Sequence, residues 1–163
     1  MSLVLDAETK GHEAMVQDEL RLWLRLFTCF TLVDSEVRRR LRERFEATLP
    51  RFDLMAQLER ADAGMPLGEI SRRMMVSNGN VTGLVERLTA SGHILREADP
   101  ADRRVQMIRL TLKGRDEFAR MAAEHGRWID ELFAGLEPNE VADLLRLLGR
   151  LKTSVTTALE SGA

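Results

Sequence analysis

The residues of this sequence that can make specific polar contacts are concentrated between positions 77 and 104. One group includes Asn78 and Thr82, whose amide and hydroxyl groups can reach base edges or phosphates, and asparagine is the natural bidentate partner of adenine. The other group is the run Asp102-Arg103-Arg104. Arginine carries a planar fork of donors that matches phosphate oxygens and base edges. These residue types therefore indicate contact with a nucleic acid.

Two short helices and a hairpin must position these side chains. Apolar residues recur at three- and four-residue spacing over 67–75 and again over 77–92, which predicts two amphipathic helices. The polar face of the second helix is short and nearly free of bulk, and Gly92 suits a left-handed cap at its end. Branched residues predict strands over 93–97 and 105–111, with a turn signal between them. A helix-turn-helix followed by a charged hairpin is typical of a protein whose second helix enters the DNA major groove.

Longer helices are predicted on both sides of this unit. Proline fits the first turn of a helix, where no amide partner is needed, so Pro50 and Pro138 mark helix starts. Thr111 can cap a helix in the same way that Thr48 does, and a loop is expected over 61–65. The predicted helices run over 19–47, 48–60 and 112–136 and from Pro138 onward.

The terminal helices carry more apolar surface than the central unit can cover. The stripe of the first helix includes Leu20, Trp23 and Phe27, and the last helix repeats apolar residues at helical spacing for over three turns. A second copy of the chain presenting the same surface would cover both faces in a two-fold dimer. The alternative is that these helices pack on one another within a monomer. The amount of apolar surface favours the dimer.

Three segments resemble the MarR family of transcriptional regulators. The family's recognition helix, wing and exit into a long helix are similar to VTGLVERLTASGHILRE (81–97) and DPADRRVQMIRLTLKG (99–114), and its second helix is similar to LPRFDLMAQL (49–58). The resemblance extends over nearly the whole chain. It implies a mainly α fold with a small β-hairpin, namely a winged helix-turn-helix with long N- and C-terminal dimerisation helices.

The same resemblance implies a division of roles along the chain. Residues 1–47 and 112–163 would form a helical dimerisation region, and residues 48–111 would form the winged helix-turn-helix DNA-binding lobe, within a single compact domain overall. The protein would be an obligate homodimer that usually represses transcription until a small ligand binds.

DNA contacts are expected from the second helix of the pair and from the hairpin tip. By the family pattern, Arg104 enters the minor groove, Asp102 holds its guanidinium through a bidentate pair, and Arg103 meets phosphate. Ser77 is alternatively the N-cap of its helix, and Gly83 removes one side chain that could read bases. The expected DNA-binding residues are Ser77, Asn78, Asn80, Thr82, Arg87, Asp102, Arg103 and Arg104.

A ligand pocket is expected between the dimer helices and the DNA-binding lobe, where the pockets of the family lie. Aromatic and methionine walls with one or two cationic groups would suit an aromatic acid or its acyl-CoA thioester, and the arginine-rich run 38–44 could hold the phosphates of the latter. Alternatively, these residues are ordinary core or dimer contacts and the run is a solvated helix face. The candidates are Trp23, Phe27, Phe30, Arg38, Phe52, Met55, Met121, His125 and Trp128.

Composition limits the other classes of function. The chain has 163 residues, of which 44% are hydrophobic and 31% charged, as in ordinary soluble globular proteins. No apolar run approaches the roughly 20 residues of a membrane helix, and the N-terminus shows no secretion signal. A cytoplasmic protein is therefore expected, with Cys29 in the core rather than in a redox-sensing site. The histidines are far apart and no nucleophile motif is present, so we expect no metal, no cofactor and no enzymatic activity.

The charge distribution supports DNA binding only locally. The net charge is −2, but the segment from Arg72 to Arg104 holds six basic and four acidic residues. Such a mildly basic surface is compatible with salt-dependent binding to phosphates. We interpret the sequence as a homodimeric repressor that binds a pseudo-palindromic, double-stranded DNA operator and is released by a small-molecule effector. The alternative is a winged-helix dimer that serves as a protein-interaction or ligand-binding module without sequence-specific DNA binding.

Overall fold

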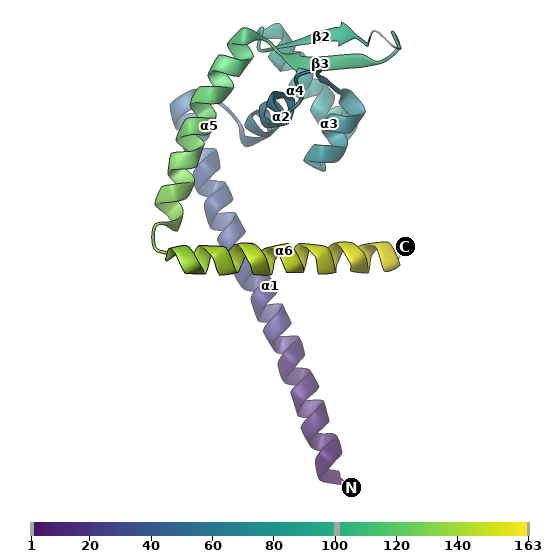
Figure 1. Cartoon of the computed structure of the whole chain (residues 1–163), viewed down its shortest axis with the longest axis vertical. Helices are drawn as coiled ribbons and strands as arrows, with labels where there is room; N and C mark the ends of the chain where they lie inside the picture. Colours follow the sequence, from purple (N-terminus) through teal and green to yellow (C-terminus); the bar gives the residue numbers. More distant parts are fainter. Residues whose placement is uncertain (1, 100–101, 163) are drawn as a thin grey trace. The chain divides into compact units, whose positions relative to one another are not determined.

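The structure, a computed structural model, describes residues 2–99 and 102–162, and for residues 2–16 and Asn78 it describes the backbone alone. The described residues form six helices and a three-stranded sheet in the order α1-α2-β1-α3-α4-β2-β3-α5-α6 (Figure 1). They divide into two units, Met1–His125 and Gly126–Ala163, and each unit is described by itself. The predicted mainly α fold with a small β-hairpin is confirmed.

Three short helices in the first unit build the core of a lobe. They are α2 (Leu49–Glu59), α3 (Leu67–Met74) and α4 (Asn78–Ala90). The predicted start of α2 is confirmed, because the Thr48 side chain accepts a hydrogen bond from the Arg51 amide at 3.4 Å. The helices bury one apolar face each, so that the interior of the lobe is formed by Leu54, Met55, Leu58, Ile70, Val81, Val85 and Leu88.

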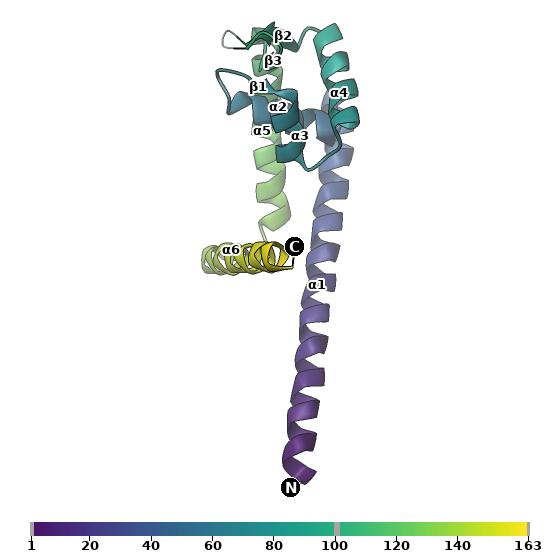
Figure 2. The same cartoon turned by 90° about the vertical axis from the view of Figure 1, so that its right-hand side faces the viewer.

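A three-stranded antiparallel sheet completes the lobe. Its strands are β1 (Met65–Pro66), β2 (Ile94–Ala98) and β3 (Gln106–Leu110), in the order β1-β3-β2, and Ile108 pairs with Met65 on one side and Arg96 on the other. Helix α2 packs against β3 and helix α4 against β2 (Figure 2). We call β2, β3 and their connection the wing.

Strand β1 shortens the loop expected over 61–65 by one residue, since Met65 belongs to the strand and residues 61–64 form the loop. Two residues carry no alternating pattern, so β1 could not be found from hydrophobic periodicity. Its position depends on Gly64, which has a φ of +84° and would bring an added Cβ within 2.6 Å of Arg109 Cγ. The Arg109 Nε donates to the Ala63 carbonyl at 2.9 Å and holds this turn beside β3.

The terminal helices differ slightly from the prediction. Helix α1 (Ser2–Phe45) begins well before the expected Glu19, because the preceding segment contains no proline to stop it. Helix α5 (Leu112–Phe133) ends before the expected residue 136. Helix α6 (Pro138–Ser161) begins at the predicted proline, where the Glu140 carboxylate accepts from the Glu137 amide at 2.8 Å.

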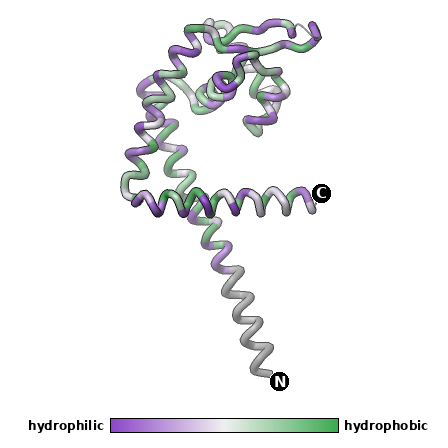
Figure 3. The backbone as a smooth tube through the Cα atoms, in the orientation of Figure 1, coloured by the Kyte–Doolittle hydropathy of each residue, from purple (hydrophilic) through white to green (hydrophobic). Residues whose placement is uncertain are grey.

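Both units leave large apolar side chains uncovered. Figure 3 colours the backbone by hydropathy and shows hydrophobic stretches along both α1 and α6. On α1, Trp23 is 59% exposed and Phe30 is 66% exposed. Cys29 between them is exposed as well, so the expectation that it lies in the core is wrong for a single chain, since nothing in the described part of its unit covers this stretch of α1. On α6 the exposed large apolar residues are Leu144, Leu145, Leu147, Leu148, Val155 and Leu159. None of the helices in the described residues combines the length and the apolar character needed to cross a membrane.

Candidate nucleic-acid interface

Helix α4 presents the polar face that its sequence predicts. Gly79 and Asn80 are exposed, and Thr82 and Gly83 are partly exposed, while Val81, Leu84, Val85 and Leu88 turn inward and are buried. The side chain of Asn78, also expected here, lies outside the described residues. We call the solvent side of α4, formed by Gly79, Asn80, Thr82, Gly83 and Arg87, the recognition surface.

The first turn of α4 is arranged differently from the prediction. Ser77 does occupy the N-cap position, with its carbonyl accepting from the Val81 amide at 3.3 Å. Its side chain makes no capping hydrogen bond in the described structure, however, so the expected bond to the first-turn amides is not formed. An extended Ser77 with an exposed hydroxyl stands at the N-terminal end of the recognition surface instead.

The tip of the wing is held by a backbone contact. The Asp102 Oδ1 accepts from the Arg104 amide at 3.0 Å, and the Asp102 carbonyl accepts from the Val105 amide at 2.9 Å. In the described structure Asp102 therefore binds the backbone of Arg104, not its guanidinium as expected, because an aspartate side chain readily accepts from the amide two residues on in an Asx turn. The exposed side chains of Arg103 and Arg104 remain directed to solvent.

Several arginines of the lobe lack the carboxylate partners that most arginines of α1 have. Arg38 is bonded to Asp34 at 2.7 Å, and Arg39 and Arg40 each approach Glu36 at 2.6 Å. Five arginines around the recognition surface and the wing have no carboxylate oxygen within 4.0 Å among the described residues: Arg72, Arg87, Arg96, Arg103 and Arg104. Positive charge that is not neutralised internally is thus concentrated where phosphates would bind.

A buried polar cluster that the sequence gave no reason to expect lies behind the recognition surface. His93, 6% exposed, bonds to Glu117 of α5 through Nε2 and to the Ser91 hydroxyl through Nδ1 at 2.7 Å. The Arg51 guanidinium donates to the other oxygen of Glu117 at 2.7 Å. The cluster joins α2, α5 and the end of α4. Arg51 is 42 residues from His93 in the sequence and 66 from Glu117, and only a histidine directly after a helix-capping glycine gave any signal.

The neutral form of His93 fits this cluster. Burial lowers the pKa of His93 below its ordinary 6.5, more than the nearby Glu117 raises it, and Arg51 and Lys113 lower it further. Burial also lowers the pKa of His125. The neutral ring satisfies both neighbours, since Nε2–H can donate to Glu117 while Nδ1 accepts from Ser91.

Stability is consequently expected to fall in mild acid. Below about pH 6.5 the unfolded chain binds protons that the folded histidines resist, so the free energy of unfolding should drop by up to about 1.4 kcal/mol per pH unit for each histidine. Urea unfolding of the wild type and of His93→Gln at pH 7.5 and 5.5 measures this. The substitution should remove the part of this pH dependence that comes from His93 and leave the part that comes from His125. Equal pH dependence in both proteins would contradict the assignment.

The link between the wing and α5 is unusually close. The Thr111 Oγ1 donates to the Gly92 carbonyl at 2.7 Å and accepts from the Gly114 amide at 3.1 Å, which confirms its predicted capping role. The Thr111 amide donates to the His93 carbonyl at 3.0 Å. A Cβ on Gly114 would lie 2.0 Å from that same carbonyl oxygen, so only glycine fits at this position.

Comparisons with known proteins agree with this geometry. The MarR family model matches residues 47–105, which include the recognition surface and most of the wing. A MarR family transcriptional regulator from Silicibacter pomeroyi has a TM-score of 0.73 at 29% identity, over 85% of this chain and 96% of the other. The segment 47–105 belongs to the MarR family.

Other relatives extend the comparison. The transcriptional activatory protein BadR of Rhodopseudomonas palustris is 29% identical over 90% of this chain and 87% of its own. A Bacillus subtilis HTH-type regulator is 35% identical over 82 residues, so the match spans only 53% of that relative's length. The same fold, with a TM-score of 0.74 at 21% identity, occurs in Sco3205 of Streptomyces coelicolor, which was solved in complex with DNA, over 84% of this chain and 87% of the other.

The expected ligand residues of the first unit do not line one common pocket among those described. Trp23, Phe27 and Phe30 are exposed on α1, whereas Met55 and Met121 are fully buried in the core of the first unit. The Phe52 ring packs against His125 and Phe118, with centroids 4.9 and 5.5 Å away. Trp128 belongs to the second unit. Of the nine candidates, only Arg38 lines the pocket described next.

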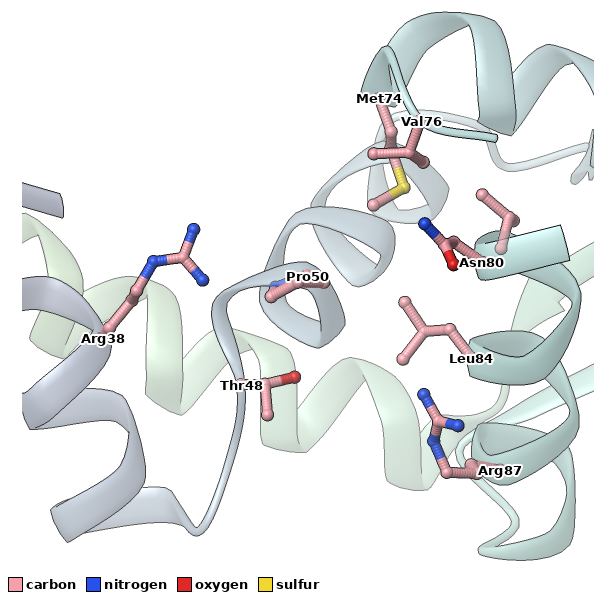
Figure 4. Close-up of a pocket in the computed structure, with 9 residues that line it drawn as sticks. Arg38, Thr48, Pro50, Met74, Val76, Asn80, Leu84 and Arg87 are labelled. Atoms are coloured by element: carbon pink, nitrogen blue, oxygen red, sulfur yellow. The ribbon is translucent and has the colours of Figure 1, made fainter. Parts of the chain in front are cut away.

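A pocket of about 430 Å³ lies between α1, the start of α2 and α4 (Figure 4). Its walls are mostly apolar, and Arg38 and Arg87 stand at its edges. Asn80 and Arg87 belong to both this pocket and the recognition surface. Sequence reasoning missed the pocket because its walls come from four separate segments. The apolar wall residues are Pro50, Met74, Val76, Val81 and Leu84.

Proposed function

We propose that this MarR-family protein is a homodimeric transcriptional regulator that binds double-stranded DNA with the recognition surface and the wing. The observation that carries the proposal is the set of unneutralised arginines around a helix face that lacks bulk. It reconciles DNA binding with a net charge of −2, because most of the α1 arginines are neutralised by nearby carboxylates, whereas the five arginines named above have no carboxylate partner among the described residues. The DNA complex of a protein with the same fold supports this use of the lobe.

Arg104→Ala tests the proposal. The side chain at the wing tip is expected to enter the minor groove, so its removal should weaken operator binding by roughly 1–3 kcal/mol. Fluorescence anisotropy on a duplex selected by the protein from a random-sequence pool measures this. Arg120→Ala is the matched control, since it removes an equally exposed arginine from α5 and should change affinity less than twofold. Unchanged binding in Arg104→Ala would favour a winged-helix module that does not read DNA.

The apolar pocket beside Arg38 and Arg87 supports an effector-binding role for the same protein. A cavity of about 430 Å³ suits a small aromatic acid, whose ring would contact Met74 and Leu84 while its carboxylate meets a guanidinium. It is too small to enclose an acyl-CoA thioester. Because Asn80 and Arg87 line it as well, a bound acid would engage groups that the DNA needs, and DNA and ligand would weaken each other's binding equally.

Thermal unfolding with a panel of hydroxylated benzoic acids tests the effector role. A ligand at one hundred times its Kd should stabilise the folded protein by about 2.7 kcal/mol and raise the melting temperature. Leu84→Glu, which fills the pocket with a negative charge, should abolish the shift. Arg60→Ala, which removes an exposed arginine outside the pocket, should retain it. If no acid in the panel changes the melting temperature of the wild type, this class of effector is excluded.

A further inference from the structure

Met75, between α3 and α4, has a backbone conformation that does not suit its side chain. It is the C-cap of α3 and has a φ of +55°, in the left-handed region. Glycine enters this region without steric cost, whereas a methionine Cβ is crowded there. Residues in such conformations cluster at functional sites, where the strained residue has a use.

That use is not the packing of the lobe. The Met75 side chain is 92% exposed, more than any other large hydrophobic residue whose side chain is described. It therefore adds almost no buried apolar area to the folded state. A residue that strains the backbone and stabilises no core is a candidate for contact with a partner.

The neighbours of Met75 show which partner fits. It lines an open hollow of about 530 Å³ together with Gly68, Arg72 and Ser77. Ser77 begins the recognition surface, and Arg72 is one of the arginines without a carboxylate partner in the described structure. The hollow also reaches Ser71, whose Oγ is buried and lacks a hydrogen-bond partner among the described residues. The exposed thioether thus stands between a free cation and the N-terminal end of α4, in continuity with the candidate DNA interface.

We propose that Met75 determines base specificity by contacting the 5-methyl group of a thymine in the major groove, while Arg72 binds an adjacent phosphate. This inference rests on the proposed DNA binding. The thymine methyl is the apolar group that the major groove displays, and it distinguishes thymine from cytosine without a hydrogen bond. A methionine is well suited to it, because its unbranched, polarisable side chain adapts to a small apolar target.

Uracil substitution in the operator tests the contact directly. A duplex selected from a random-sequence pool by the full-length protein is resynthesised with deoxyuridine at each thymine in turn, which removes one methyl group at a time. Replacing one particular thymine of each half-site should lower the affinity of the wild type about three- to fivefold. This is the change expected from the loss of one buried methyl group. Met75→Gly should bind the thymine and deoxyuridine forms of that position equally, while keeping or raising the melting temperature.

Leu112→Ala is the matched control, because Leu112 is also a highly exposed apolar residue, at 82%, but lies at the start of α5. This variant should keep the wild-type response to every deoxyuridine. If Met75→Gly gives the same deoxyuridine profile as the wild type, the inference is overturned while DNA binding stands. If the wild type selects no duplex at all, the proposed function fails and this inference fails with it.

Discussion

Gly114→Ala is expected to lower the free energy of unfolding by about 3 kcal/mol or more. The added Cβ would lie 2.0 Å from the His93 carbonyl oxygen and 3.2 Å from Leu110 Cδ2. The first of these atoms belongs to the backbone and is bonded to the Thr111 amide, so it cannot move aside without breaking that bond. Urea unfolding at a fixed protein concentration measures the change as a lower midpoint with an unaltered slope.

Gly126→Ala is the control on the same helix. A Cβ at Gly126 meets no atom within 4 Å, so the substitution should stabilise α5 by roughly 0.5–1 kcal/mol through its higher helix propensity. The two variants make the same chemical change with opposite expected signs. If Gly114→Ala proves no less stable than Gly126→Ala, the close approach of α5 to the end of α4 is wrong.

Phe27→Glu is expected to convert the proposed homodimer into monomers at micromolar concentration. Phe27 is 55% exposed on α1, beside Trp23 at a centroid distance of 6.0 Å. Burial of a phenylalanine contributes about 1.5–3 kcal/mol, and a two-fold interface contains the residue twice. The dissociation constant should therefore rise at least about a hundredfold. Sedimentation equilibrium over a range of concentrations measures it.

Arg25→Glu supplies the comparison for this variant. It introduces the same glutamate two residues away, which is on the opposite side of an α-helix. The dimer should persist in this protein. Dissociation of both variants to the same extent would mean that charge alone, and not loss of the Phe27 contact, separates the chains. Persistence of the dimer in Phe27→Glu would place the interface elsewhere.

The parts of the fold that follow from local physics were predictable from the sequence. Helix α2 begins at its Thr48 cap, and Thr111 caps α5, because a hydroxyl beside a helix start has few other uses. Strand β1 was missed, because two residues obtain their structure only from pairing with β3. The predicted environment of Cys29 was also wrong. Periodicity identifies an apolar stripe, but it does not show whether a single chain covers that stripe.

The candidate site likewise contains parts that could be predicted from the sequence and parts that could not. The polar face of α4 and the exposed arginines of the wing were predictable, because each depends on spacing within one element. The buried cluster around His93 was not, since Arg51 and Glu117 reach it from two other helices. Met75 was not singled out either, because its type fits a core helix and only its φ of +55° and its exposure reveal it.

The hydrogen bonds of Thr111 connect the base of the wing to the end of α4 and to the first turn of α5. One residue binds Gly92 where the hairpin begins, His93 beside it, and Gly114 in the first turn of α5. A tilt of α5 is therefore expected to carry the end of α4 and both strands of the wing with it. The footprint of one protomer on its half-site should then stay constant during such a movement. In the proposed dimer, such a movement would change only the separation and phase of the two half-sites, and so the operator spacing that the protein tolerates, not the bases that it prefers.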